Sequence, residues 1–344
     1  MQKLRTGAAY HGCRMLHHVE HDMRDMADHN MNLVVHMLSH TDWDRHNRVM
    51  KDIVGISGEA GLEVWIDNWG LGGPPGDKSH FLSYYPEAHQ IYSTGEPDPV
   101  RVCLRQPSFR TFMKAWIDTV ADSGAKTIFW DEPHLPAKGA VYSCTCPLCQ
   151  KVFEERYGRP MPVLLDDDAA EFRLDTIEEY FRDLCDYAAS KGLKNAVCVM
   201  LGEGIGINLS TLGKIGGIES LDNIGSDPYW GYREDVNPYE FVYRGTRKTL
   251  ETAEQFGKDH NVWIQAFGVP RGREEEIVQA TEAAYDAGAR TIIAWGYFGS
   301  ISNDYAAQDP YLTRVKMNEA FARIRGFERD RVRAENRRLV GLKD

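Results

Sequence analysis

Short apolar runs alternate with amphipathic segments along the whole chain. Runs rich in β-branched and aromatic residues have the composition of buried strands, and between them apolar residues recur at helical spacing. Several helical segments end at a glycine, the usual residue just past a helix C-terminus. The eight predicted strands lie within residues 6–14, 32–39, 62–70, 125–133, 195–203, 222–230, 261–268 and 290–299, and the predicted helices include 16–30, 109–124, 176–192, 241–257 and 275–289.

Eight strand-helix units predict a single (β/α)8 TIM barrel. The chain has 344 residues, and we assign the barrel to 1–325 and a charged C-terminal helix or tail to 326–344. A doubly wound open sheet is the alternative fold. It is disfavoured because GEGIG (202–206), which follows the fifth strand, lacks the last glycine of a dinucleotide-binding motif.

Net charge narrows the choice of partners. A formal charge of −11 disfavours nucleic acid or an anionic membrane as the main partner, because either would require a basic face. No apolar run has the length of a signal peptide or a membrane span, so we expect a cytoplasmic protein. The seven cysteines are then expected to be reduced thiols or metal ligands rather than disulfides.

Polar and aromatic residues accumulate at the predicted C-terminal ends of the strands, where barrel enzymes carry their catalytic groups. Carboxylates and amides hydrogen-bond sugar hydroxyls, and aromatic faces stack on the C–H faces of a pyranose, so this mixture predicts a carbohydrate site. The candidate substrate-binding residues are His11, His36, Asp67, Asn68, Trp69, Asp131, Tyr229, Trp230, Gln265 and Trp295.

The sequence Asp131-Glu132-Pro133 ends the fourth predicted strand. It resembles the acid/base position of retaining barrel glycosidases, where an Asn-Glu pair ends the same strand; here Asp131 replaces the Asn. A second carboxylate beside Glu132 disfavours its ionisation and raises its pKa, which suits a general acid. Glu132 is therefore the predicted catalytic acid.

Cysteines crowd the next segment. Cys144, Cys146 and Cys149 form C-x-C-x2-C, and Cys103 precedes the helix that leads into the fourth strand. Four thiolates suit one tetrahedral structural zinc, which would hold a long loop segment that lacks a core of its own. This layout resembles the zinc-binding cluster of the family-42 bacterial β-galactosidases, which implies a glycosidase with a structural zinc and, because those enzymes are commonly oligomeric, a homo-oligomer.

The seventh predicted strand departs from that family. Gln265 stands where a retaining glycosidase has its nucleophilic Glu, and an amide cannot attack an anomeric carbon. Asp227 is our predicted second catalytic carboxylate, with Glu203 as the next candidate. Carboxyl groups about 5 Å apart imply retention, whereas about 6.5–9.5 Å implies inversion through a water. The fourth and sixth strands are not adjacent, which favours the wider gap.

Two other readings remain open. Strand-end carboxylates together with His11, His36 and His40 are also compatible with a divalent cation, as in barrel sugar isomerases and epimerases. Gln265 alone favours a catalytically silent carbohydrate-binding barrel. We rank a glycoside hydrolase acting on a small glycoside or oligosaccharide first.

Overall fold

The computed structural model describes residues 3–73, 79–131, 135–201, 212–233 and 235–339. Parallel strands close into a barrel in the order β1-β12-β11-β10-β9-β6-β3-β2, and every one of them lies within a predicted strand segment or overlaps it. The single (β/α)8 barrel is thereby confirmed. The barrel strands are β1 (Arg5–Tyr10), β2 (Leu33–Met37), β3 (Glu63–Asp67), β6 (Thr127–Trp130), β9 (Lys194–Val199), β10 (Asn223–Ser226), β11 (Asp259–Gln265) and β12 (Thr291–Trp295).

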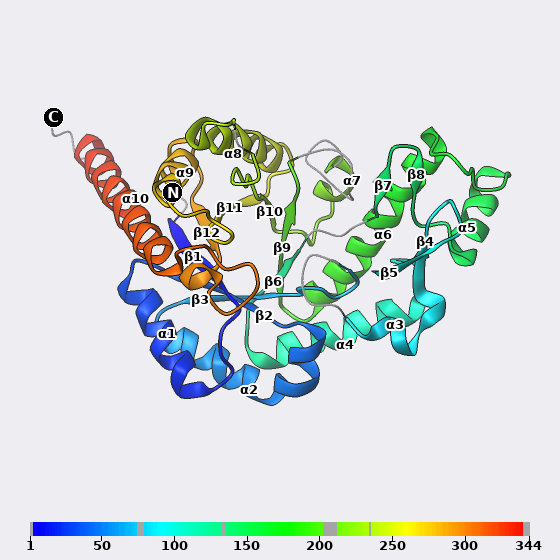
Figure 1. Cartoon of the computed structure of the whole chain (residues 1–344), viewed down its shortest axis with the longest axis horizontal. Coiled ribbons are helices and arrows are strands. Elements are labelled where there is room, and N and C mark those ends of the chain that lie inside the picture. Colours follow the sequence, from blue (N-terminus) through cyan, green and yellow to red (C-terminus); the bar gives the residue numbers. More distant parts are fainter. Residues whose placement is uncertain (1–2, 74–78, 132–134, 202–211, 234, 340–344) are drawn as a thin grey trace.

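Helices surround the barrel (Figure 1). Ser39 and Asp42 form a reciprocal capping box at the start of α2, and Gly124 ends α4 in the left-handed conformation at φ 89°. The last helix runs across the predicted boundary at 325. No helix within the described ranges is long and apolar enough to cross a bilayer. The helices are α1 (Leu16–Asp28), α2 (His40–Glu59), α4 (Pro107–Ser123), α6 (Asp167–Ser190), α7 (Gly213–Gly216), α8 (Pro238–Gln255), α9 (Glu275–Asp286) and α10 (Pro310–Leu339).

Alternation along each strand divides the core in two. Trp65, Phe129 and Trp263 belong to the cluster that fills the barrel, whereas neighbours such as Ile66 and Ile264 belong to the cluster between strands and helices. All five side chains are almost fully buried. Because both faces of each strand are covered, the strands are apolar on both sides, as buried parallel strands are.

Two long connections, after β3 and after β6, build a small lobe at one side of the barrel (Figure 1). The two connections are joined by hydrogen bonds, from the Thr145 amide to the Ile91 carbonyl (2.8 Å) and from Ser143 Oγ to Gln90 Oε1 (2.6 Å). We call this unit the lobe. It contains α3 (Phe81–Tyr84), η1 (Pro86–Ala88), β4 (His89–Ile91), β5 (Pro97–Val102), β7 (Ala137–Lys138), β8 (Val141–Tyr142) and α5 (Pro147–Tyr157).

Candidate active site at the carboxyl ends of the strands

A cavity of about 400 Å³ lies at the carboxyl ends of the strands. Its wall is mainly aromatic and carries two carboxylates and one guanidinium, which is the composition expected of a small-molecule site in a barrel. The lining residues are Trp69, Phe129, Asp131, Cys198, Met200, Leu201, Asp227, Tyr229, Tyr232, Arg233, Phe241, Trp263, Phe267, Trp295 and Tyr305.

The two carboxylates come from separate strands. Asp131 directly follows β6 and Asp227 directly follows β10, and β9 lies between these strands in the barrel. The backbone of Asp131 is held from β3, because its amide donates to Asn68 Oδ1 at 3.0 Å. The Trp130 indole also donates to Asn195 Oδ1 at 2.9 Å, which fixes the end of β6 to β9. The structure therefore orients the position of Asp131 through two neighbouring strands.

Packed aromatic rings, in tilted and edge-to-face contacts, form the floor of the cavity. The ring of Trp263 lies 4.8 Å from that of Phe129 and 5.3 Å from that of Trp295. His11 lies between Trp69 and Trp295, with ring centroids 4.7 and 5.0 Å away. These packed rings present a rigid apolar surface, which is suited to the apolar face of a sugar ring.

His11 is uncharged near neutral pH. Burial lowers its pKa to about 4, and the nearby Arg14 guanidinium adds to this effect. The Nε2 atom is buried and has no hydrogen-bond partner within the described part of the chain. The neutral imidazole packs against two cavity tryptophans, but His11 itself does not line the cavity as the structure describes it.

Asp67 is the last residue of β3 and lies two residues before Trp69 in the sequence. Its side chain is fully buried. Burial raises its pKa well above the usual range, although the Trp69 amide acts in the opposite direction. No side chain in the described ranges donates a hydrogen bond to either carboxylate oxygen. A carboxyl group in these surroundings favours its protonated form.

His36 and Trp230, two of the candidate substrate-binding residues, lie away from the cavity. His36 points outward from β2, where its Nε2 lies 2.9 Å from Ser57 Oγ of α2. The buried Trp230 donates its indole N–H to Glu276 of α9 at 2.7 Å. Both side chains hydrogen-bond helices packed on the barrel, and neither lines the cavity as the structure describes it.

Gln265 and Asn68 also have structural partners. Gln265 is buried, accepts a hydrogen bond from the Gly231 amide at 2.9 Å and donates to the Phe267 carbonyl at 3.2 Å. Asn68 holds the Asp131 amide, as described above. Neither side chain lines the cavity as the structure describes it. Both hold backbone groups at or next to residues that do line it.

Trp69, Asp131, Asp227, Tyr229 and Trp295 are brought together in the cavity wall, as the strand-end pattern predicted. The two other proposed catalytic residues, Glu132 and Glu203, lie outside the described residues. Several lining residues were missed by the sequence reasoning. They come from loops, from the second residue beyond a strand or from the first turn of α8: Tyr232, Arg233, Phe267, Tyr305 and Phe241. For all of them but Arg233, aromatic character is the one signal that could have indicated them.

The four cysteines of the predicted zinc site form a buried cluster in the lobe. Their sulfurs all lie within 4.8 Å of one another, with Cys103 Sγ 3.5 Å from Cys149 Sγ and 3.6 Å from Cys146 Sγ. Hydrogen bonds from the neighbouring thiols, first that of Cys103, lower the pKa of Cys146, whereas burial raises the pKa of Cys144. The cluster is therefore compatible with a metal ion and stabilises at least one thiolate.

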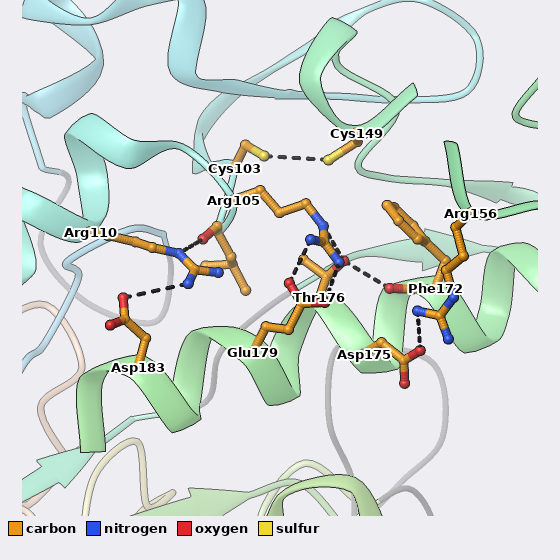
Figure 2. Close-up of polar contacts among 11 residues, drawn as sticks. Cys103, Arg105, Arg110, Cys149, Arg156, Phe172, Asp175, Thr176, Glu179 and Asp183 are labelled. Carbon is orange, nitrogen blue, oxygen red and sulfur yellow. Dashed lines mark hydrogen bonds and ion pairs between the residues drawn. The ribbon is translucent and has the colours of Figure 1, made fainter. Parts of the chain in front are cut away.

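The cysteine cluster is anchored to α6 through a neighbouring arginine. Figure 2 shows Cys103 and Cys149 facing each other, with Arg105 extending to the helix. Arg105 donates to Thr176 Oγ1 at 2.9 Å and to Glu179 at 2.6 Å, and its guanidinium lies 4.6 Å from the centre of the Phe172 ring. The cysteine cluster and α6, the helix that leads into β9, are thus part of one packed unit. This unit lies outside the cavity wall.

Comparisons with known proteins show the fold. No protein-family model matches the chain, and no curated protein matches its sequence. Its structure is similar to the catalytic domain of a β-amylase from Paenibacillus polymyxa (TM-score 0.62, 10% identity, 86% of this chain and 92% of the other). It is also similar to the PgaB (BpsB) glycoside hydrolase domain from Bordetella bronchiseptica (0.60, 13%, 92% and 99%) and to a D-psicose 3-epimerase from Clostridium cellulolyticum H10 (0.54, 11%, 94% and 98%). Glycoside hydrolases and sugar epimerases therefore share this barrel.

Proposed function

We propose that the protein is a glycoside hydrolase that cleaves a small glycoside or oligosaccharide. One observation carries this proposal: Asp131 and Asp227, from separate strands, line one cavity whose floor is made of packed aromatic rings. Glycoside hydrolysis requires two carboxyl groups across a sugar subsite, one to protonate the leaving oxygen and one to attack or to activate water. The resemblance of the Asp131-Glu132-Pro133 segment to a glycosidase acid/base strand supports the same reading.

Glu132 is the proposed general acid and Asp227 the proposed second carboxylate, with Glu203 as its substitute. Asp131, beside Glu132, disfavours a second negative charge and so keeps the acid protonated. Adjacent strands lie about 4.8 Å apart, so groups on β6 and β10 start at most about 10 Å from each other. Because β9 separates the two strands, the wider carboxyl separation of an inverting reaction is favoured, in which Asp227 activates a water.

Ligand binding is assigned to the cavity wall. Trp69, Tyr229 and Trp295 would stack on sugar rings. His11 packs against Trp69 and Trp295 from outside this wall and stays a predicted ligand-binding residue. Asp67, which is fully buried and does not line the cavity, would contribute as a protonated carboxyl. The expected ligand is therefore an uncharged carbohydrate with at least one ring buried against tryptophan.

Four cysteines are proposed to hold a structural zinc. Zn–S bonds of about 2.3 Å in a tetrahedron place sulfurs about 3.8 Å apart, close to the 3.5 and 3.6 Å separations from Cys103 Sγ. Zinc would fix the lobe and take no part in the reaction, because the cluster lies outside the cavity wall. A cytoplasmic location and self-association stay predictions from the sequence.

The test is a screen of aryl glycosides, including galactosides, with product anomers followed by NMR. We expect hydrolysis with inversion, and a loss of about 10²–10⁴-fold in kcat for Asp227→Asn and, on substrates with poor leaving groups, for Glu132→Gln. Asp235→Asn, an exposed carboxylate on the same connection but outside the cavity wall, is the matched control. Full activity of Asp227→Asn would refute its role.

A sugar isomerase or epimerase is the second candidate, since barrels of this fold include a D-psicose 3-epimerase. It predicts metal-dependent interconversion of free sugars without hydrolysis. Chelator sensitivity separates the two functions, provided that unfolding through loss of the cysteine-bound metal is followed in parallel by circular dichroism. Binding without turnover of either kind would indicate a silent carbohydrate-binding barrel.

A further inference from the structure

A second group of metal-ligating side chains lies at the rim of the barrel, apart from the cysteines. His40 begins α2 three residues beyond the end of β2, and Asp44 follows four residues later on the same face of that helix. His80, just before α3, completes the group. The possible ligand atoms of the three residues all lie within 4.8 Å of one another.

The three side chains already converge through polar contacts. His80 Nε2 lies 2.9 Å from one carboxylate oxygen of Asp44, and His40 Nε2 lies 3.9 Å from the other. In a tetrahedral site with Zn–N bonds of 2.0–2.1 Å, neighbouring ligand atoms are about 3.3 Å apart. The observed separations bracket this value, so small movements are enough to enclose an ion.

The proton position on His40 is set by a neighbouring hydroxyl. Ser79 Oγ accepts a hydrogen bond from the Phe81 amide at 3.2 Å and lies 2.8 Å from His40 Nδ1. A proton on Nδ1 that is donated to Ser79 leaves the lone pair of Nε2 directed toward Asp44. Metal-binding histidines characteristically donate their other ring nitrogen to such a partner, which fixes the tautomer.

The rings differ in freedom. His40 is held against Phe112, with ring centroids 4.8 Å apart, and 9% of its side chain is exposed. His80 stacks on His40 at 3.7 Å and keeps 39% of its side chain exposed, so it is the ring that can turn to aim its nitrogen at an ion. Asp44 is half exposed, which leaves room for water as a further ligand.

We propose that His40, Asp44 and His80 bind one divalent transition-metal ion of the zinc class. Two imidazoles and one carboxylate form a ligand set typical of zinc sites that keep an open position. The ion would join α2 to the segment before α3 and so fix the base of the lobe. This inference is independent of the proposed hydrolase activity, because none of the three residues lines the described cavity wall.

The test uses tag-free protein whose cysteine cluster remains loaded, after dialysis against a weak chelator. Isothermal titration with Zn²⁺ should show about one additional ion per chain with micromolar affinity. Co²⁺ added at this site should give ligand-field absorption without the thiolate charge-transfer bands of a cysteine site. Zinc uptake only at millimolar concentration, or bands from thiolate ligands, would overturn the proposal.

Variants assign the ion to these residues. We expect His80→Ala and Asp44→Asn to weaken zinc binding at least about tenfold, and Ser79→Ala to weaken it by about the same factor by freeing the tautomer. His21→Ala, a histidine that is 82% exposed and 3.6 Å from Asp22, is the matched control and should bind zinc like the wild type. Equal affinity in His80→Ala and the wild type would refute the site. If His80→Ala does not fold, Asp44→Asn decides alone.

Discussion

Replacing Asp67 by Asn should change how stability depends on pH. Burial raises the pKa of Asp67 in the folded protein, while in the unfolded chain it is near 3.9. Between these two values the folded state holds a proton that the unfolded state has lost, so the wild type loses stability as pH rises. Asn carries no titrating proton, and this part of the pH dependence should disappear.

The size of the effect follows from the linkage relation. One proton of difference gives a slope of about 1.4 kcal/mol per pH unit, up to the folded-state pKa. An unfolding entropy of about 2.1 cal/mol/K per residue over 344 residues is about 0.7 kcal/mol/K. The Tm of Asp67→Asn should therefore gain about 2 °C on the wild type for each pH unit between about 4 and the folded pKa.

Calorimetry at several pH values from 5 to 8 measures this difference, and the slope rather than the absolute Tm is decisive. Asp98→Asn is the matched control. Burial alone would raise the pKa of Asp98, but the Val100 amide, Arg101 and the Tyr92 hydroxyl together lower it. Its stabilisation is complete above pH 4 and lost as pH falls further, so this variant should lose about 1.5–3 kcal/mol uniformly from pH 5 to 8. If the difference in Tm between Asp67→Asn and the wild type does not change with pH, the argument is refuted.

Further predictions concern the metal, the cavity and assembly. Metal analysis of protein purified without chelator should give about one zinc per chain, held by the cysteine cluster. Cys146→Ser should lower both the zinc content and the Tm. Cys185→Ser, at a buried thiol outside the cluster, should keep the zinc. Tyr232→Ala should remove about 0.5–1.5 kcal/mol of ring stacking, or about 2- to 12-fold in KM with kcat nearly constant, while Tyr84→Ala, equally exposed but outside the cavity wall, should leave KM unchanged. Light scattering should find an oligomer at micromolar concentration, and a monomer alone would remove that prediction.

The fold was predictable because the strand and helix periods differ. Buried parallel strands appear as short runs of β-branched residues, and the helices show a one-sided apolar pattern. Cavity residues within two positions of a strand end, such as Trp69, Asp131 and Asp227, could be found for the same reason. The spacing of Cys144, Cys146 and Cys149, together with the upstream Cys103, was equally informative. These four cysteines form one cluster although they come from two separate connections.

The remaining site residues could not be predicted, for two physical reasons. The sequence of a strand that is apolar on both faces does not reveal which of its residues point inward. The direction of His36, which points toward a helix and not into the barrel interior, could therefore not be predicted. Residues in long loops, such as Tyr232 and Tyr305, reach the cavity along paths that tertiary contacts determine. Gln265 lies on the expected strand, but its amide is occupied by loop backbone groups, which no local pattern encodes.

The lobe also offers a place to lengthen the chain. A long connection normally costs conformational entropy, but here two connections share a cysteine cluster and hydrogen bonds, so the hairpin of β4 and β5 is held at its base. The tip of this hairpin, at Thr94 and Gly95, is exposed, and a side chain at Gly95 would meet open space. A reporter peptide inserted there would leave the barrel strands, both termini and the cavity untouched, which would allow the protein to be immobilised on a surface in a defined orientation.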